Sequence, residues 1–173
     1  MVETWLETNK VHSFNIDGRT FDDTSYGKGK GCGISSLASR KLSQTKHYIA
    51  KPKYQTMSII DETNVGNRYQ VVLVCASSGC PFEELVKDMA KILETNLTAI
   101  GDFNFDWREN NALTRFLAKK KFTQLVDWPT HIKGNTLDHC YVSNNTRVQS
   151  TRHSPYYSDH SALCLEFEHF PWN

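Results

Sequence analysis

The stretch at residues 99–107, AIGDFNFDW, constrains the fold more than any other part of this sequence. A mostly apolar run at residues 97–100 stops at Gly101, and Asp102 and Asn104 follow at once. This is the pattern of a buried strand that delivers polar side chains to its carboxyl end. Because residues two apart in an extended chain point the same way, the pattern predicts that Asp102 and Asn104 share one face. A carboxylate and an amide side by side can hold a water and a substrate oxygen, which suits phosphate esters.

Asp and Asn after a glycine are also ordinary turn residues, so this pair alone leaves open a turn without chemistry. Two later segments favour a site. The chain reads GNTLDHCYVS at residues 134–143 and YYSDHSALCLEF at residues 156–167, and each places an aspartate beside a predicted strand. A carboxylate inside a packed body needs a cation, a histidine or several donors beside it. We expect His160 and a metal ion to serve Asp138 and Asp159 in this way.

These motifs resemble the endonuclease/exonuclease/phosphatase superfamily. That family includes abasic-site endonucleases, pancreatic-type deoxyribonucleases, inositol-polyphosphate 5-phosphatases and the endonuclease domains of non-LTR retrotransposons and related mobile elements. The transposon-encoded branch is the most similar. Four motifs carry the resemblance in the family's order: ETWL at residues 3–6, GDFN at residues 101–104, LDH at residues 137–139 and SDH at residues 158–160.

The resemblance implies an α/β fold, namely a four-layer sandwich of two packed mixed β-sheets flanked by helices, formed by a single domain over residues 1–173. It also implies a DNA-nicking endonuclease domain of mobile-element origin, associated with a reverse transcriptase and dependent on Mg²⁺, for which Mn²⁺ can substitute. In the implied site, Glu3 and Asp159 are metal ligands, and Asp102 activates the attacking water. Asn104 binds water and phosphate oxygens. His160, paired with Asp138, donates to the phosphoryl oxygen.

The sequence departs from the family pattern at two places. The strand and helix that precede the Glu3 position in the family have no counterpart here, so we expect an N-terminally incomplete domain whose uncovered sheet edge favours self-association. The family commonly has Tyr-Arg at the end of the strand predicted at residues 68–76, where this chain has Cys75 and Ala76. A thiol is a weak donor and alanine removes a phosphate clamp, although an alignment shifted by a few residues is the alternative explanation.

Two other functions therefore stay open. One is a catalytically inactive relic that at most binds nucleic acid or a partner. The other is a phosphatase of a small phosphorylated substrate, against which stands the lack of a lysine and arginine cluster in the predicted substrate loops.

Composition sets further bounds. With 173 residues, of which 39% are hydrophobic, the chain is long enough for one domain with a real core. A formal net charge of +1 neither favours nor excludes nucleic acid. The start of the sequence is not that of a signal peptide and no apolar run reaches membrane-spanning length, so we expect an intracellular protein, nuclear if it acts on genomic DNA. Five cysteines without a CxxC pair indicate neither a disulfide framework nor a zinc site, and Cys140 and Cys164 are predicted to be small core residues.

The rest of the sequence predicts the roles of several aromatic side chains and the secondary structure around these motifs. Three histidines, His131, His139 and His153, are predicted to be ordinary loop or strand residues, and Trp107 and Trp128 either fill core and shape loops or stack on bases. The expected elements are a loop at residues 10–30, strands at residues 31–37, 54–61 and 68–76 with a turn at residues 64–67, and helices at residues 81–93 and 111–120, the second closed by lysines at 119–121.

Overall fold

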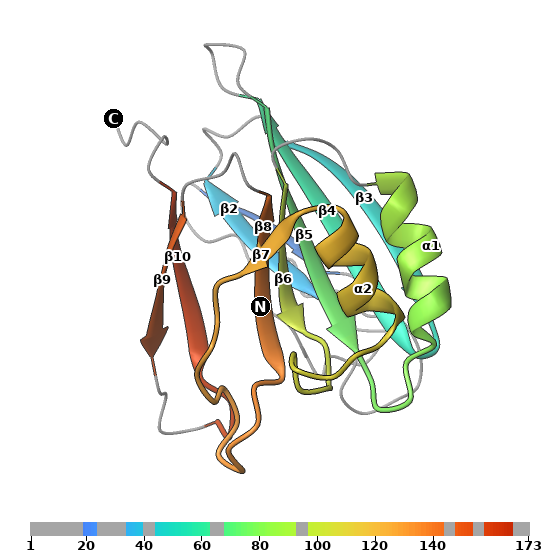
Figure 1. The fold of residues 1–173 in the computed structure, drawn as a ribbon. Helices are drawn as coiled ribbons and strands as arrows, with labels where there is room; N and C mark the ends of the chain where they lie inside the picture. The colour runs from blue at the N-terminus through green and yellow to red at the C-terminus, as the bar shows by residue number, and fades with distance from the viewer. Residues whose placement is uncertain are drawn as a thin grey trace.

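A mixed six-stranded sheet forms the centre of the molecule (Figure 1). A computed structural model describes residues 19–23, 34–39, 44–62, 68–92, 97–143, 148–153 and 158–167. The central sheet pairs β5 with β6 in parallel and all its other neighbours antiparallel. Its strands, in spatial order, are β3 (Gln44–Lys51), β4 (Tyr54–Glu62), β5 (Arg68–Ala76), β6 (Leu97–Asp102), β8 (Asp138–Ser143) and β7 (Phe122–Gln124).

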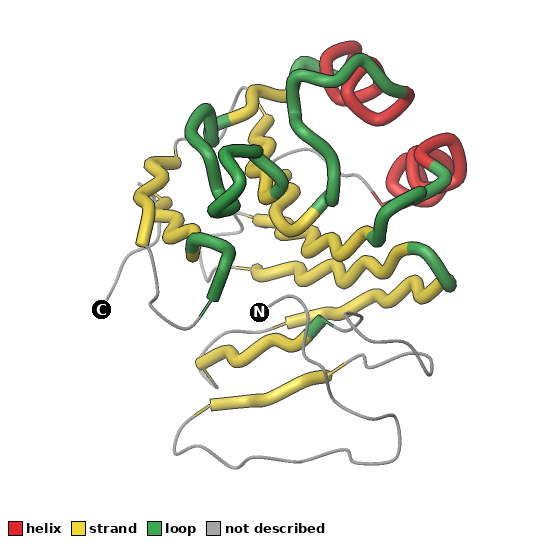
Figure 2. The backbone as a smooth tube through the Cα atoms, turned by 90° about the horizontal axis from the view of Figure 1, so that it is seen from below, coloured by secondary structure: helices red, strands yellow, loops and turns green. Residues whose placement is uncertain are grey.

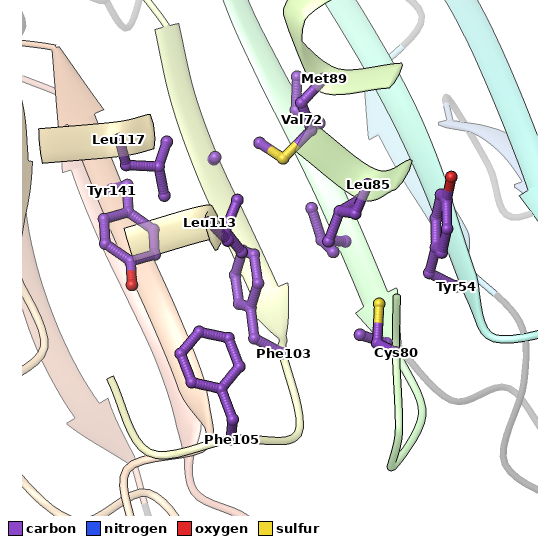
Figure 3. Close-up of a cluster of buried hydrophobic side chains, with 13 residues drawn as sticks. Tyr54, Val72, Cys80, Leu85, Met89, Phe103, Phe105, Leu113, Leu117 and Tyr141 are labelled. Atoms are coloured by element: carbon purple, nitrogen blue, oxygen red, sulfur yellow. The ribbon is translucent and has the colours of Figure 1, made fainter. Parts of the chain in front are cut away.

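Two helices cover one face of this sheet (Figure 2). They are α1 (Phe82–Ile92) and α2 (Ala112–Lys119). Asn111 begins α2 as a capping box, because its side chain accepts from the Leu113 and Thr114 backbone while the Thr114 hydroxyl accepts from the Asn111 N–H. The apolar stripes of the helices pack on every second residue of β5 and β6, as Figure 3 shows for much of this cluster. Its buried members include Leu85, Met89, Leu113, Leu117, Val72, Val74, Ala99 and Phe103.

Two small antiparallel sheets are associated with the other face (Figure 2). One joins β1 (Arg19–Asp23) to β2 (Ser35–Ser39), and Ile34, just before β2, packs on Met57 and Cys75. The other joins β9 (Val148–His153) to β10 (Ala162–Phe167), and Leu163 and Leu165 pack on the cluster around Cys140. The described part therefore has helices on one face and small sheets on the other. It contains no outer helical layer, so a four-layer arrangement is not seen within these ranges.

Most predicted elements are confirmed. The strands at residues 54–61 and 68–76 are β4 and β5, and the predicted helices are α1 and α2, with ends shifted by one or two residues. The predicted turn at residues 64–67 lies outside the described residues. The lysines at 119–121 do close α2, and all three are exposed.

One prediction about the first third of the chain was wrong, and another is confirmed in part. The expected loop at residues 10–30 contains β1. The strand expected at residues 31–37 overlaps β2 (Ser35–Ser39), and residues 31–33 lie outside the described part. The strand β3 was not predicted at all. These are polar or charged segments that gain their strand conformation by pairing with a neighbour, and that information is not local to the sequence.

Candidate functional site

Two aspartates face each other where strands β6 and β8 meet at the sheet edge. Asp102 ends β6 and Asp138 begins β8, and the antiparallel register places these two residues directly opposite. Two residues further in, Ile100 and Cys140 both pack into the cluster on the face away from the helices. Because side chains alternate along a strand, Asp102 and Asp138 point to that same face.

Gly101 lets β6 run close to β5 at this edge. Its φ is 150°, and a Cβ added there would lie 1.8 Å from the carbonyl oxygen of Val74. No side chain fits in that space, so only glycine can occupy this position of the GDFN motif.

The chain turns sharply after Asp102. The Asp102 Oδ1 accepts a hydrogen bond of 2.8 Å from the Asn104 backbone N–H, and Asn104 has a left-handed φ of 56°. The prediction that Asp102 and Asn104 lie in extended chain was therefore wrong, because the carboxylate holds an Asx-type turn instead. Asp102 is buried at the base of this turn and Asn104 is exposed at its tip.

The predicted pairing of Asp138 with His160 is present. The His160 Nδ1 lies 2.8 Å from the Asp138 Oδ2, and this hydrogen bond raises the pKa of His160 to about 9. Burial opposes that shift, whereas the charges of Asp138, Asp102 and Asp159 add to it. At neutral pH the ring is thus an imidazolium whose Nδ1–H is engaged by Asp138, and three carboxylates lie within its electrostatic reach.

The loop at residues 129–136 holds the SDH motif at residues 158–160 against this edge. Thr130 is buried, and its Oγ1 accepts hydrogen bonds of 3.0 Å from the backbone N–H groups of Leu137 and Asp138. The backbone of the same loop also pairs with residues 159–161, since the Ser161 N–H donates to the Thr130 carbonyl at 2.7 Å. These contacts bring Asp159 and His160 beside Asp138, although they are distant in sequence.

His131 belongs to this group, although its sequence context predicts only an ordinary loop or strand histidine. It forms an isolated β-bridge with His160, and its Nε2 lies 3.4 Å from the Asp159 Oδ2. The side chain is 11% exposed. Its only sequence signal is its place in a loop between two motifs, which does not distinguish it from an ordinary loop histidine.

His139 confirms the prediction of a structural strand histidine. It is fully buried, stacked on Phe103, and burial lowers its pKa to about 4. The neutral ring donates from Nε2 toward the carbonyls of Phe105 (2.9 Å) and Thr136 (3.0 Å), and its Nδ1 accepts from the Tyr141 hydroxyl. His139 therefore ties the loop after Asn104 to β8 and takes no part in the candidate site. His153 also confirms its prediction, as an exposed residue of β9.

Three residues of this group are spaced so that they could hold a metal ion. One atom each of His131, Asp159 and His160 lies within 4.8 Å of the others. However, the His131 Nδ1 accepts the Lys133 backbone N–H at 3.1 Å, so a neutral ring carries its proton on Nε2. The Asp159 carboxylate is the oxygen donor of this group, the type of ligand that Mg²⁺ prefers. Glu3 lies outside the described residues.

Cys75 and Ala76 end β5 beside the candidate site. Cys75 pairs in register with Asp102, and it is buried against Ile34 and Met57. Ala76 points to the opposite face and packs in the cluster under the helices. The end of β5 therefore presents apolar packing next to Asp102, where the resembling family commonly has a tyrosine and an arginine.

The other cysteines divide into core and surface. Burial raises the pKa of the Cys80 thiol to about 11 and that of Cys140 to about 12, which makes both unreactive. Cys140 thus confirms its prediction, whereas the prediction for Cys164 was wrong, because this residue lies on the exposed face of β10. No disulfide joins the cysteines that the structure describes. Cys32 lies outside that part.

The two tryptophans of the candidate loops differ. Trp128 packs against the cluster around Cys140, which confirms the core interpretation for this residue. Trp107 is half-buried in the loop after β6, and stacking on a base stays a prediction for it.

None of the helices in the described ranges is both long and apolar enough to span a membrane.

Comparison of the chain with protein-family models, with curated proteins and with solved structures gave no match.

Proposed function

We propose that this chain is a Mg²⁺-dependent phosphodiester hydrolase, and specifically a DNA-nicking endonuclease domain of mobile-element origin. One observation carries the proposal. The hydrogen-bonded Asp138 and His160 pair, 2.8 Å apart, lies at the sheet edge where Asp102 is held opposite Asp138. A charged imidazolium beside several carboxylates can serve a reaction in which one group donates to a phosphate oxygen and another accepts a proton from water.

Each residue has a role that follows from its position. Asp138 holds the ring of His160 through Nδ1, so the Nε2–H is the donor to a non-bridging phosphate oxygen. Asp102, fixed by the Asn104 N–H, orients and deprotonates the attacking water. The exposed Asn104 side chain binds that water and the phosphate. Asp159, together with Glu3 as the resemblance implies, would hold Mg²⁺, which would supply neutralisation of charge on the phosphate and the leaving group.

The same proposal sets the partner and the place of action. The partner is the DNA phosphodiester backbone, and the compartment is intracellular, in the nucleus for genomic DNA. In the four-layer sandwich that the resemblance implies, the two small sheets would belong to a second sheet packed on the central one.

A nicking assay with supercoiled plasmid tests the proposal. We expect wild-type protein to convert the plasmid to open circles in Mg²⁺ and not in EDTA. His160→Ala should reduce the initial rate about 100- to 1,000-fold, the typical cost of removing one such donor. His153→Ala is the matched control, because this histidine is exposed on β9. An equal rate in His160→Ala and wild type would contradict the proposal.

The buried apolar end of β5 favours a second candidate, an inactive relic that at most binds nucleic acid. Cys75 is packed beside Asp102 and provides no hydroxyl for a phosphate. If wild-type protein is folded and retards DNA in a gel, yet shows no nicking at any Mg²⁺ concentration, the relic is the better description. Release of phosphate from a small monoester without nicking would instead favour a phosphatase.

A further inference from the structure

We infer that His131 is a positioning residue that holds the Asp159 carboxylate in its orientation for binding the metal ion. This inference rests on the proposed function, because it concerns one of the proposed metal ligands. Neither the motifs nor the sequence patterns assign any role to His131.

The backbone fixes His131 beside Asp159 before any side-chain contact is considered. The Ile132 N–H donates to the Asp159 carbonyl at 2.9 Å, and the Ser161 N–H donates to the Thr130 carbonyl at 2.7 Å. His131 lies between these two bonds and forms a β-bridge with His160. Opposed residues of such a bridge project to the same side, and the two rings meet edge to face with centroids 4.9 Å apart.

The hydrogen bond at Nδ1 determines which nitrogen of the His131 ring carries the proton. The Lys133 backbone N–H donates to the His131 Nδ1 at 3.1 Å, which requires a lone pair on Nδ1. The proton of the neutral ring is therefore on Nε2, and this atom lies 3.4 Å from the Asp159 Oδ2. His131 thus presents a fixed N–H donor to the carboxylate, whereas a metal ligand would present a lone pair.

Asp159 needs such a fixed neighbour. Its side chain is 61% exposed, and an exposed carboxylate samples several rotamers whose loss on metal binding costs free energy. The ring of His131, by contrast, is nearly buried and is held at Nδ1. A rigid donor beside one carboxylate oxygen restricts the side chain in advance and leaves the second oxygen for the metal. Removal of an outer partner of this kind typically weakens metal binding about 10- to 100-fold.

Two substitutions separate the donor from the ring. His131→Phe keeps a planar ring against His160 and loses the N–H. His131→Gln loses the ring and retains an amide N–H donor at a similar distance from the backbone. Asp159→Ala, alone and combined with His131→Phe, shows whether the effect passes through the carboxylate.

The experiment is calorimetric titration of the DNA-free protein with MnCl₂, which measures metal binding without reference to activity. We expect His131→Phe to raise the Kd for Mn²⁺ about tenfold. His131→Gln should bind close to wild type, and His131→Phe should have no further effect in the Asp159→Ala background. In nicking assays the Mg²⁺ concentration for half-maximal rate should rise in His131→Phe by more than the maximal rate falls. Circular dichroism at the titration temperature confirms that each variant is folded.

Several results would overturn the inference. They are a wild-type Kd in His131→Phe, a Kd in His131→Gln as weak as in His131→Phe, or an undiminished effect of His131→Phe in the Asp159→Ala background. The absence of Mn²⁺ binding by wild-type protein would also overturn it. Failure of the proposed function is distinguishable: wild-type protein would then bind Mn²⁺ with the expected pattern and nick no DNA. Normal nicking with an unchanged Mg²⁺ dependence in His131→Phe would contradict the inference alone.

Discussion

The charge of His160 comes from its surroundings, and Asp138 is its main cause. A hydrogen bond to a carboxylate fixes both the ring's orientation and its proton. The two residues should therefore act as one unit in catalysis, with neither retaining its full effect alone.

A double-mutant cycle tests this coupling. Asp138→Asn and His160→Ala should each lower the nicking rate about 100- to 1,000-fold. Their combination should lose little more than the worse single variant, because either change already disables the pair. Rates are measured at saturating Mg²⁺ on the same plasmid. Multiplicative losses would show that the residues act independently.

His139 is expected to make stability depend on acid pH. Its folded pKa of about 4 lies below the ordinary value of 6.5, so the unfolded chain binds a proton more readily than the folded one. This contribution to the free energy of unfolding is fully present above pH 6.5. It is lost as the pH falls toward 4, by up to about 1.4 kcal/mol per pH unit.

His139→Gln provides the comparison for that prediction, because an amide can replace the hydrogen bonds without titrating. Urea unfolding at a series of pH values between 7 and 4 should show a shallower loss of stability in the variant. If both proteins lose stability in parallel, His139 is not the titrating group.

Single residues also show where the sequence was informative. Asp102, Asp138 and His160 were predicted together because each lies in a motif beside a strand, and the structure brings them together. The turn at Asn104 depends on a hydrogen bond to Asp102, and the place of His131 depends on pairing between two loops. Such contacts arise only in the folded molecule, so the sequence pattern could not predict them.

Among the elements, β6 carries the strictest steric requirement. Gly101→Ala would place a methyl group against the Val74 carbonyl and also impose a side chain on a φ of 150°. The conformation alone costs about 1–3 kcal/mol, and the clash adds to it. Chemical denaturation should show at least this loss. A midpoint equal to that of wild type would contradict the close approach of β6 to the Val74 carbonyl.

The helix α2 depends on its N-cap. Asn111→Ala removes the acceptor for two backbone N–H groups, at Leu113 and Thr114. We expect a loss of about 0.5–2 kcal/mol in the free energy of unfolding. Asn111→Ser, which can still accept, should restore most of it. If Asn111→Ser is as destabilised as Asn111→Ala, the cap contributes little.

Elements with strong periodicity were predictable, and those defined by pairing were not. The strands β4 and β5 and both helices follow apolar patterns, and their bounds were close to those observed. The strands β1 and β3 have polar sequences, RTFDD and QTKHYIAK, which carry no clear alternation. Their conformation is set by the neighbouring strand.

At the scale of the whole molecule, the central sheet separates two kinds of packing. The helical face holds the larger core, and the opposite face holds the small sheets and the candidate site. The α/β mixture agrees with the fold that the resemblance implies and with the strands and helices expected along the chain. The sequence did not predict that the second layer is divided into two small sheets. This division depends on which strands pair: within the described ranges, β1 and β2 pair only with each other, and so do β9 and β10.

The decisive measurement is the initial rate of supercoiled-plasmid nicking by the wild-type chain, in Mg²⁺ and in EDTA. If the Asp102, Asp138 and His160 group is a phosphodiesterase centre, open circles accumulate in Mg²⁺ in proportion to protein concentration and none form in EDTA. Folded protein that leaves the plasmid supercoiled in Mg²⁺ and in Mn²⁺ would show that this group is not a phosphodiesterase centre.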